Sequence, residues 1–214
     1  MTEELLLIDK PKGITSFDVI RILRKKLKVR KMGHAGTLDP NATGLLLIGV
    51  GNGTKKLHEL LGMSKEYIAE ILLGIKTSTG DICGEVIESK PVTNISLEKI
   101  KEILKSLEGE IEIRVPIYSA IKIKGKPLYK YARQKEEIEP PKKIMTVLNA
   151  QLLNFDPENN LVEISFKVKS GTYIRSITEE FGERLETVAT LNNLRRISIG
   201  NFSVNSAKSL DSIN

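Results

Sequence analysis

The feature that constrains the fold most strongly is a continuous apolar run, as long as a strand, which directly follows a glycine-rich loop. Residues 43–50 read TGLLLIGV, which predicts a core strand. The preceding loop, residues 33–44, reads GHAGTLDPNATG, and its only carboxylate is Asp39. Because Asp39 precedes Pro40, its backbone is biased toward an extended conformation, and the glycines allow bends or close approach to a ligand. Two interpretations remain open from these residues: an ordinary Asp-Pro-Asn turn, or a working acid held on a loop.

Other periodicities predict an α+β fold with a mixed, mainly antiparallel sheet. Helical spacing follows Thr15 to about Lys28, follows Ser96 to a stop at Gly109, and links Ile174 to Leu185. Apolar or alternating runs predict further strands at residues 5–8, 66–74, 161–169 and 197–204. Strands are interspersed with helices, which favours the α+β class.

Length and charge bound the class of protein. A chain of 214 residues can bury roughly 70% of the surface that it exposes when extended, so a single domain over residues 1–214 is expected. The net charge of +6 favours a polyanionic partner. Six basic residues fall within residues 24–31, RKKLKVRK, and suit either a solvated helix end or phosphate contacts.

The single cysteine and the absence of targeting signals indicate a reducing compartment. Cys83 alone excludes an internal disulfide framework and a cysteine-based zinc site, and a buried, inert thiol is expected. The start MTEELLLIDKPKG is neither a secretory signal nor a transit peptide, and no apolar run is long enough to span a bilayer. We expect a soluble, cytoplasmic protein.

Residues 118–143 differ in kind from the predicted core. They contain eight Lys or Arg, three Tyr and three Pro, with little regular apolar periodicity. An exposed insertion is therefore expected.

The residues available for chemistry argue against several enzyme classes. Two histidines and one cysteine do not supply metal-ligand spacing, and the chain lacks the GxxxxGK[ST], GxGxxG and GxSxG motifs. What remains is Asp39, Tyr67 and Arg175 as candidate members of one cofactor-free site. Taken singly, Tyr67 also suits a core strand, and Arg175 suits a surface helix.

Several stretches resemble, in the same order, the bacterial tRNA pseudouridine-55 synthases of the TruB family. They are LLLIDKPKGITSFDVI, GHAGTLDPNATG, KEYIAEILLG, VPIYSAIKIKGKPLYKYARQ, KSGTYIRSI and LNNLRRISIG, which together span nearly the whole chain. The resemblance implies a pseudouridine synthase fold and the isomerisation of uridine 55 in the T loop of tRNA. No net oxidation or hydrolysis occurs in this reaction, so no cofactor or metal is expected.

The resemblance also implies roles for individual residues. Asp39 corresponds to the essential catalytic residue, which must be ionised, and a guanidinium from Arg175 would favour that form by charge pairing. Tyr67 corresponds to the aromatic residue that stacks on the target uracil. His34 corresponds to the residue that fills the space left by the flipped uridine, although a lone loop histidine is otherwise usually solvated.

Weaker matches concern the substrate pocket and the insertion. Tyr173 is expected to pack in the uracil pocket, Asp81 to contact the RNA loop, and Lys10 to contact the pocket or a phosphate. The insertion at residues 118–143 corresponds to a flexible thumb that closes on the T-arm stem-loop, where its basic and tyrosine side chains would meet phosphates and nucleotides.

One departure and two rival functions accompany this interpretation. Many relatives continue into a small C-terminal RNA-binding domain of the PUA type, which we do not expect here, so contacts outside the T-arm should be reduced. The rivals are a guide-RNA-dependent pseudouridine synthase and a non-catalytic tRNA-binding or folding chaperone. We expect a monomer with tRNA as its partner and no membrane association.

Overall fold

The computed structural model describes residues 5–213, whose backbone forms two compact units. Unit 1 contains the chain up to Ile68, Phe166–Ser170 and the chain from Asn193, and unit 2 contains Ala69–Ser165 and Gly171–Asn192. Three strands have residues in both units: β4 (Lys65–Leu73), β11 (Leu161–Val168) and β12 (Ala189–Ile199). The expectation of a single domain stays a prediction.

Among residues 5–213, the main sheet has nine strands. Besides the three just named they are β1 (Leu5–Lys10), β2 (Met32–His34), β3 (Thr43–Val50), β7 (Gly109–Arg114), β10 (Lys142–Asp156) and β13 (Phe202–Ser203). Their order is β1-β3-β12-β4-β11-β10-β7, with β2 paired to β3 and β13 paired to β12. The β1–β3, β2–β3, β7–β10 and β12–β13 pairs are antiparallel, whereas β12 and β3 are parallel. The predicted α+β class with a mixed, mainly antiparallel sheet is confirmed.

The helices and small hairpins complete the secondary structure. The helices are α1 (Ser16–Leu27), α2 (Leu57–Gly62), α3 (Leu97–Leu107), α4 (Leu128–Arg133) and α5 (Ile174–Arg184), and the 3₁₀ turns are η1 (Gly51–Lys56) and η2 (Val204–Ser206). Two hairpins pair β5 (Ile75–Thr77) with β6 (Val86–Ser89) and β8 (Lys122–Ile123) with β9 (Lys126–Pro127). No helix among residues 5–213 has the length and apolar character to cross a membrane.

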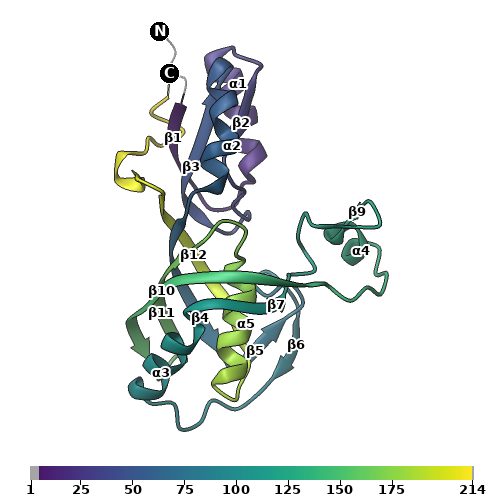
Figure 1. The fold of residues 1–214 in the computed structure, drawn as a ribbon, viewed down its shortest axis with the longest axis vertical. Coiled ribbons are helices and arrows are strands. Elements are labelled where there is room, and N and C mark those ends of the chain that lie inside the picture. Colours follow the sequence, from purple (N-terminus) through teal and green to yellow (C-terminus); the bar gives the residue numbers. More distant parts are fainter. Residues whose placement is uncertain (1–4, 214) are drawn as a thin grey trace. The chain divides into compact units, whose positions relative to one another are not determined.

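Strand β3 is the centre of unit 1 because both of its faces are covered. Leu46, Ile48 and Val50 join a cluster with the apolar side of α1, and Leu45 and Leu47 join a second cluster with Leu60 of α2. Both helices lie beside β1–β3 in the ribbon views (Figure 1). Burial on both faces explains why residues 44–50 carry no polar side chain instead of alternating. Each fully buried leucine or isoleucine contributes roughly 1.5–3 kcal/mol.

Helix α1 begins and ends at the residues that its sequence indicates. The Asp18 amide donates to the Thr15 hydroxyl at 3.0 Å and the Thr15 amide donates to the Asp18 carboxylate at 2.9 Å, which forms the predicted capping box. Lys28 ends the helix in the left-handed conformation, with φ of 54°. Two members of the basic run make backbone contacts within unit 1: Arg24 donates to the Met32 carbonyl, and Lys26 donates to the Leu210 and Ile213 carbonyls. A phosphate-binding role for the run stays a prediction.

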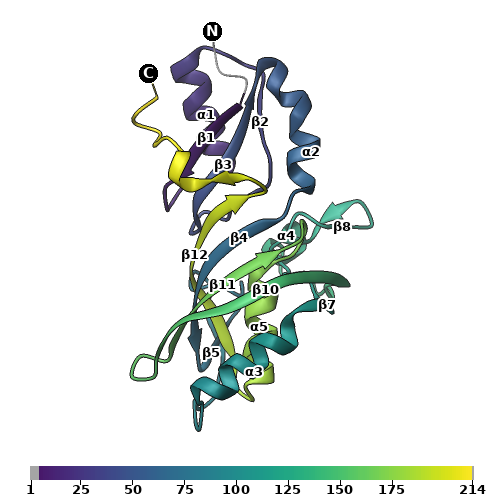
Figure 2. The same ribbon diagram turned by 60° about the vertical axis from the view of Figure 1, so that its left-hand side comes forward.

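In unit 2, α3 and α5 provide the apolar faces that cover the strands. Figure 2 shows α3 and α5 on the same side of β10. The buried side chains of α3 are Ile100, Ile103, Leu104 and Leu107, and those of α5 include Ile174, Ile177 and Phe181. The spacing of both sets is the helical spacing that predicted these elements.

The insertion leaves the sheet after β7 and returns at β10. The Val115 amide donates to the Pro141 carbonyl at 3.1 Å and so closes the base of this excursion. In Figure 1, α4 and β9 stand out from β7 and β10. Leu128 of α4 is fully buried. Because β10 begins at Lys142, the excursion ends slightly earlier than the predicted residue 143.

Two sequence expectations differ from the structure. The final strand was expected at residues 197–204, but β12 covers Ala189–Ile199 and a turn at Gly200 leads to the short β13. The polar residues Asn192 and Asn193 interrupt the apolar pattern of β12, so the sequence did not predict the first half of this strand. Cys83 was expected to be buried, but it is exposed on the loop between β5 and β6.

Candidate active site

The Asp39 loop is fastened on both sides of its carboxylate. Leu38 is buried, and its amide and carbonyl both bond to the Ser16 hydroxyl, at 2.9 and 3.1 Å. On the other side, the Pro40 carbonyl accepts from the Gly13 amide at 2.8 Å, and the Asp39 carbonyl accepts from the Ala42 amide at 3.1 Å in a turn. The two readings of this loop therefore coexist: it is a turn, and the turn holds a half-buried carboxylate in place.

Lys10 is a buried cation beneath this loop. It is 0% exposed, and its ammonium group donates to the carbonyls of Pro11 and Ile14, both at 2.8 Å, and of Pro40 at 3.3 Å. Burial lowers the pKa of Lys10 to about 8, and the nearby charge of Asp39 opposes this shift. These three hydrogen bonds all go to backbone carbonyls, and the expected substrate contact stays a prediction.

His34 lies at the end of β2, five residues before Asp39. The ring is half-buried, and its Nδ1 atom is buried without a hydrogen-bond partner. Burial lowers the pKa of His34, the charge of Arg196 lowers it further, and a contact with the Gly36 backbone opposes both. A neutral imidazole at this position is compatible with entering a stack of bases, because it brings no charge that would need hydration.

Tyr67 points inward from β4. It is 8% exposed, and the strand alternates buried and partly exposed residues as its sequence predicts. The guanidinium carbon of Arg196 lies 6.0 Å from the centroid of the Tyr67 ring, over its face. Tyr67 therefore occupies a core position on its strand and also lies beside the buried guanidinium of Arg196.

Two buried cations in unit 1 were given no role by the sequence. Arg196 of β12 is 1% exposed and donates to the carbonyls of Leu45 and Gly36. Lys65 of β4 is 6% exposed and donates to the Met63 carbonyl at 2.7 Å and to the Ser170 hydroxyl at 3.1 Å. Burial, followed by the charge of Arg196, lowers the pKa of Lys65 to about 8. The burial of β12 does not alternate around Arg195 and Arg196, so the sequence offered no local signal that Arg196 lies inside.

Gly44 explains the close approach of β3 to β12. It pairs with Arg196 in the parallel register and has φ of +100°. A Cβ atom at this position would overlap the Arg196 backbone. Glycine is therefore required here both by conformation and by space.

In unit 2, Arg175 occupies the first turn of α5 and is 6% exposed. It is therefore buried, and the alternative of a surface position on a helix is wrong. Its Nη1 donates to the Thr79 carbonyl at 2.9 Å and its Nη2 to the Tyr118 carbonyl at 3.0 Å. Arg175 thus ties α5 both to the loop that carries Asp81 and to the first part of the excursion. The expected ion pair of Arg175 with Asp39 stays a prediction.

Asp81 organises the loop on which it lies. One of its carboxylate oxygens accepts from the Thr79 hydroxyl at 2.7 Å and from the Cys83 amide at 3.1 Å. Its carbonyl accepts from the Thr77 hydroxyl at 2.6 Å. Tyr173 precedes α5 as its N-cap residue, is partly exposed, and its amide contacts the Met145 sulfur at 3.4 Å. The substrate contacts expected of Asp81 and Tyr173 stay predictions.

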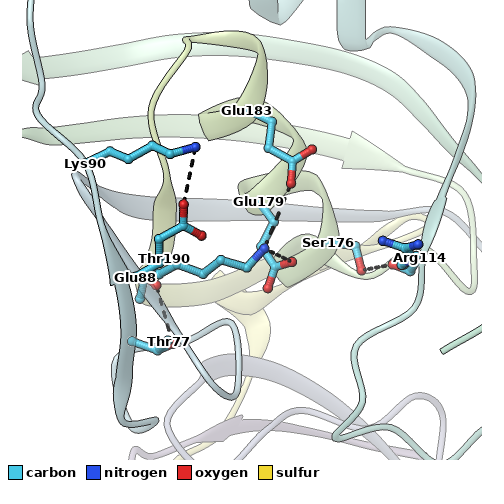
Figure 3. Close-up of polar contacts among 9 residues, drawn as sticks. Thr77, Glu88, Lys90, Arg114, Ser176, Glu179, Glu183 and Thr190 are labelled. Carbon is cyan, nitrogen blue, oxygen red and sulfur yellow. Dashed lines mark hydrogen bonds and ion pairs between the residues drawn. The ribbon is translucent and has the colours of Figure 1, made fainter. Parts of the chain in front are cut away.

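Polar contacts along α5 hold neighbouring strands of unit 2 (Figure 3). The Ser176 hydroxyl donates to the Arg114 carbonyl at 2.7 Å, at the end of β7. Lys76 lies 3.7 Å from the Glu179 carboxylate and 3.9 Å from that of Glu183. Burial raises the pKa of Glu179, and the charge of Lys76 opposes this shift. Side chains from the first to the last turn of α5 therefore anchor this helix, in addition to its packing.

The excursion uses several of its charged side chains internally. Lys126 bonds to Glu136 at 2.7 and 2.8 Å and lies 4.3 Å from the centroid of the Tyr131 ring. The Arg133 guanidinium lies 5.5 Å from the centroid of the Tyr129 ring. Such pairs keep the Lys, Arg and Tyr side chains folded against one another. RNA contact by this segment stays a prediction.

The described residues do not offer a metal site. Within residues 5–213, no three His, Cys, Asp or Glu side chains come together as a metal ion would need. The catalytic roles expected of Asp39 and Tyr67, and a reaction without a metal or a cofactor, stay predictions.

Comparisons with known proteins agree with the motifs. A family model described as TruB family pseudouridylate synthase (N terminal domain) matches residues 24–174. The tRNA pseudouridine synthase B of Carboxydothermus hydrogenoformans is 45% identical over 90% of this chain and 68% of its own length. The enzyme of the same name from Caldicellulosiruptor saccharolyticus is 46% identical over 98% of this chain and 71% of its own length.

Solved structures show the same fold. A chain from the crystal structure of a Cbf5-Nop10-Gar1 complex is similar with a TM-score of 0.75 and 28% identity. The match covers 97% of this chain and 52% of that chain, so the present chain spans about half the length of its structural neighbour. The pseudouridine synthase fold expected from the sequence is confirmed. Taken together with the family match, these likenesses show that the chain belongs to the TruB family of pseudouridylate synthases.

Proposed function

We propose that this protein is a tRNA pseudouridine-55 synthase, which isomerises uridine 55 in the T loop of tRNA. The observation that carries the proposal is the identity of 45–46% with proteins named tRNA pseudouridine synthase B over most of the chain. The fastened Asp39 loop supports it, because a catalytic carboxylate has to be held in a fixed geometry.

The reaction needs an ionised carboxylate and a base turned out of the RNA. The N1–C1′ glycosidic bond breaks, the uracil turns, and a C5–C1′ bond forms, while C5 loses its proton and N1 gains one. Asp39 is the catalytic residue, Tyr67 stacks on the uracil, and Arg175 pairs with the carboxylate. Base flipping costs a few kcal/mol of stacking, part of which His34 offsets by filling the vacated space.

The substrate is bound around this centre. Tyr173 completes the uracil pocket, Asp81 contacts the RNA loop, and Lys10 supports the Asp39 side of the pocket. The excursion over residues 118–143 closes on the T-arm with its basic and tyrosine side chains. The protein acts as a cytoplasmic monomer, without a metal or a coenzyme.

The test measures isomerisation and binding in parallel. Unmodified tRNA labelled with tritium at C5 of uridine should release tritium in stoichiometric amount, and the product should map to position 55. Asp39→Asn keeps the size and hydrogen-bonding capacity of the side chain but removes the charge, so it should bind tRNA and release no tritium. Equal release by both proteins would remove Asp39 from the mechanism, and no release by the wild type from any RNA would point to a tRNA chaperone.

A guide-RNA-dependent synthase is the rival function that has one specific observation in its support. One similar solved structure, with 26% identity, is an H/ACA RNP bound to a substrate RNA containing 2′-deoxyuridine. The higher identity to the tRNA pseudouridine synthase B proteins favours direct action on tRNA. Tritium release from naked tRNA without accessory RNA or protein distinguishes the two, because a guide-dependent enzyme would need both.

A further inference from the structure

Arg196 is among the largest fully buried side chains of the described chain, and three separate elements meet at its guanidinium. Its Nε donates to the Leu45 carbonyl on β3 at 2.7 Å, and its Nη2 donates to the Gly36 carbonyl on the Asp39 loop at 3.1 Å. The guanidinium carbon also lies 6.0 Å from the centroid of the Tyr67 ring on β4. One side chain therefore contacts the catalytic loop, the strand that follows it and the stacking tyrosine.

Arg195, the adjacent residue, differs from Arg196 in being partly exposed and paired with a carboxylate. It makes a bidentate ion pair with Asp9, at 3.0 and 2.7 Å, and its side chain is 39% exposed. Arg196 instead lies in the interior, where an ionised group is costly unless its donors are satisfied. The rigid, planar fork of a guanidinium can hold two carbonyls and lie over an aromatic ring at once, which an ammonium group cannot.

The loop is packed directly onto this fork. A Cβ atom at Gly36 would lie 3.5 Å from Nη1 of Arg196 and 3.8 Å from Cε of Lys65. Gly36 lies two residues after His34 and three before Asp39, and the Ser16–Leu38 bonds fasten the segment between Gly36 and Asp39. The position of the Asp39 backbone relative to the Tyr67 ring is therefore set by Arg196 at one end and by Ser16 at the other.

We propose that Arg196 is a positioning residue for the isomerisation: it fixes the catalytic loop and the Tyr67 ring in one geometry. This inference rests on the proposed function, and it assigns Arg196 no contact with the RNA. Misplacement of the reacting groups by about 1 Å can cost roughly 100-fold in rate, so a residue that only holds them has a measurable effect.

The charge of Arg196 gives an independent signature of the same arrangement. It contributes to lowering the pKa of His34, after burial, and to lowering the pKa of both Lys10 and Lys65. Lys10 bonds to Pro40 of the loop, Lys65 lies beside Gly36, and His34 is part of the same segment. Replacing Arg196 by a neutral side chain should therefore raise the pKa of His34, whether or not RNA is present.

Kinetic measurements on Arg196→Lys and Arg196→Met test the proposal. Arg195→Lys and Arg195→Met are the matched controls, because they make the same substitutions at the neighbouring residue. Single-turnover pseudouridine formation should fall about 10- to 100-fold in Arg196→Lys, which keeps the charge but loses the fork, with tRNA affinity unchanged. The Arg195 variants should keep the wild-type rate, because an exposed ion pair contributes little. Thermal unfolding checks that each variant is folded, and Arg196→Lys serves if Arg196→Met does not fold.

Nuclear magnetic resonance on the RNA-free protein provides the second readout. His34 and His58 are the two histidines, so the His34 imidazole titration can be resolved, with His58 as an internal reference. Arg196→Met should raise the pKa of His34 and Arg196→Lys should leave it lowered. A wild-type rate in folded Arg196→Lys would overturn the positioning role, and so would a loss confined to thermal stability. If the wild type forms no pseudouridine, both the proposed function and the positioning role are wrong. If the His34 pKa is unchanged in Arg196→Met, Arg196 does not lie close to His34, and the proposed function is not affected.

Discussion

Ser16 and Leu38 exchange two hydrogen bonds between the start of α1 and the residue that precedes Asp39. The Leu38 amide donates to the Ser16 hydroxyl at 2.9 Å, and the same hydroxyl donates to the Leu38 carbonyl at 3.1 Å. Ser16 is 1% exposed and Leu38 is 3% exposed, so water cannot replace these bonds. A single hydroxyl therefore satisfies both backbone groups of a buried loop residue.

Ser16→Ala should weaken both the fold and the reaction. Leaving two buried backbone groups unsatisfied costs about 1–3 kcal/mol of unfolding free energy, measured by denaturant titration. Because Asp39 follows Leu38 directly, the single-turnover rate should fall about tenfold or more. Ser96→Ala, which removes the N-cap of α3, is the control: it should cost about 1 kcal/mol and leave the rate unchanged. Equal rates in the two variants would mean that the Ser16 bonds do not orient the loop.

Gly44→Ala should destabilise the protein more than its backbone conformation alone explains. Gly44 has φ of +100°, and a new Cβ would overlap the Arg196 backbone, whereas Gly109 has φ of +102° and open space around it. Gly109→Ala should therefore cost about 1–2 kcal/mol for the left-handed backbone. Gly44→Ala should add roughly 1–3 kcal/mol for overpacking. Denaturant titration of both variants checks this, and similar losses would argue against the close β3–β12 approach.

Lys10→Met should change how the stability depends on pH. Burial lowers the pKa of Lys10 from 10.5 to about 8, so between these values the unfolded chain holds a proton that the folded protein lacks. Unfolding then takes up a proton, and the unfolding free energy that Lys10 contributes rises with pH. The unfolding free energy of the wild type minus that of Lys10→Met should increase by about 3 kcal/mol from pH 8 to 10.5. Lys65 remains in both proteins, so its own titration cancels, and a constant difference would contradict the prediction.

Glu179→Gln should gain stability relative to the wild type as the pH rises. Burial raises the pKa of Glu179 above 4.5, so from that value upward the folded protein holds a proton that the unfolded chain has lost. The wild type therefore loses stability across this window, and the glutamine variant does not. The side chain is 35% exposed, which limits the effect to less than about 1 kcal/mol.

Glu183→Gln is the matched control for Glu179. It also removes a carboxylate near Lys76, at 3.9 Å, but its side chain is 62% exposed. Thermal unfolding from pH 4 to 7 should separate the two variants. If the two variants gain stability alike as the pH rises, burial of Glu179 is not the cause of the gain.

The sequence predicted the elements whose signals are local. The Thr15–Asp18 capping box fixed the start of α1, continuous apolarity identified β3, and alternation around Tyr67 identified β4. In each case the burial that the structure shows is the burial that the pattern requires. The family motifs indicated the Asp39 loop, which the structure shows to be fastened at both ends.

Long-range features could not be read from the same patterns. The length of β12 depends on its partners in the sheet, and these override the polar residues of its first half. The contacts of Arg175 with Thr79 and Tyr118 join residues that are 96 and 57 positions away. The interior position of Arg196 depends on the register of β12 beside β3, which no local motif encodes.

The closed base of the excursion has a consequence for how the chain can accommodate changes in length. Because Val115 and Pro141 bond to each other, the polypeptide leaves and rejoins the sheet at a single point. Insertions, deletions or whole-segment exchanges between these two residues would leave the pairing of β7 and β10 as it is. A change in the length of the excursion therefore need not disturb the strands on either side of it.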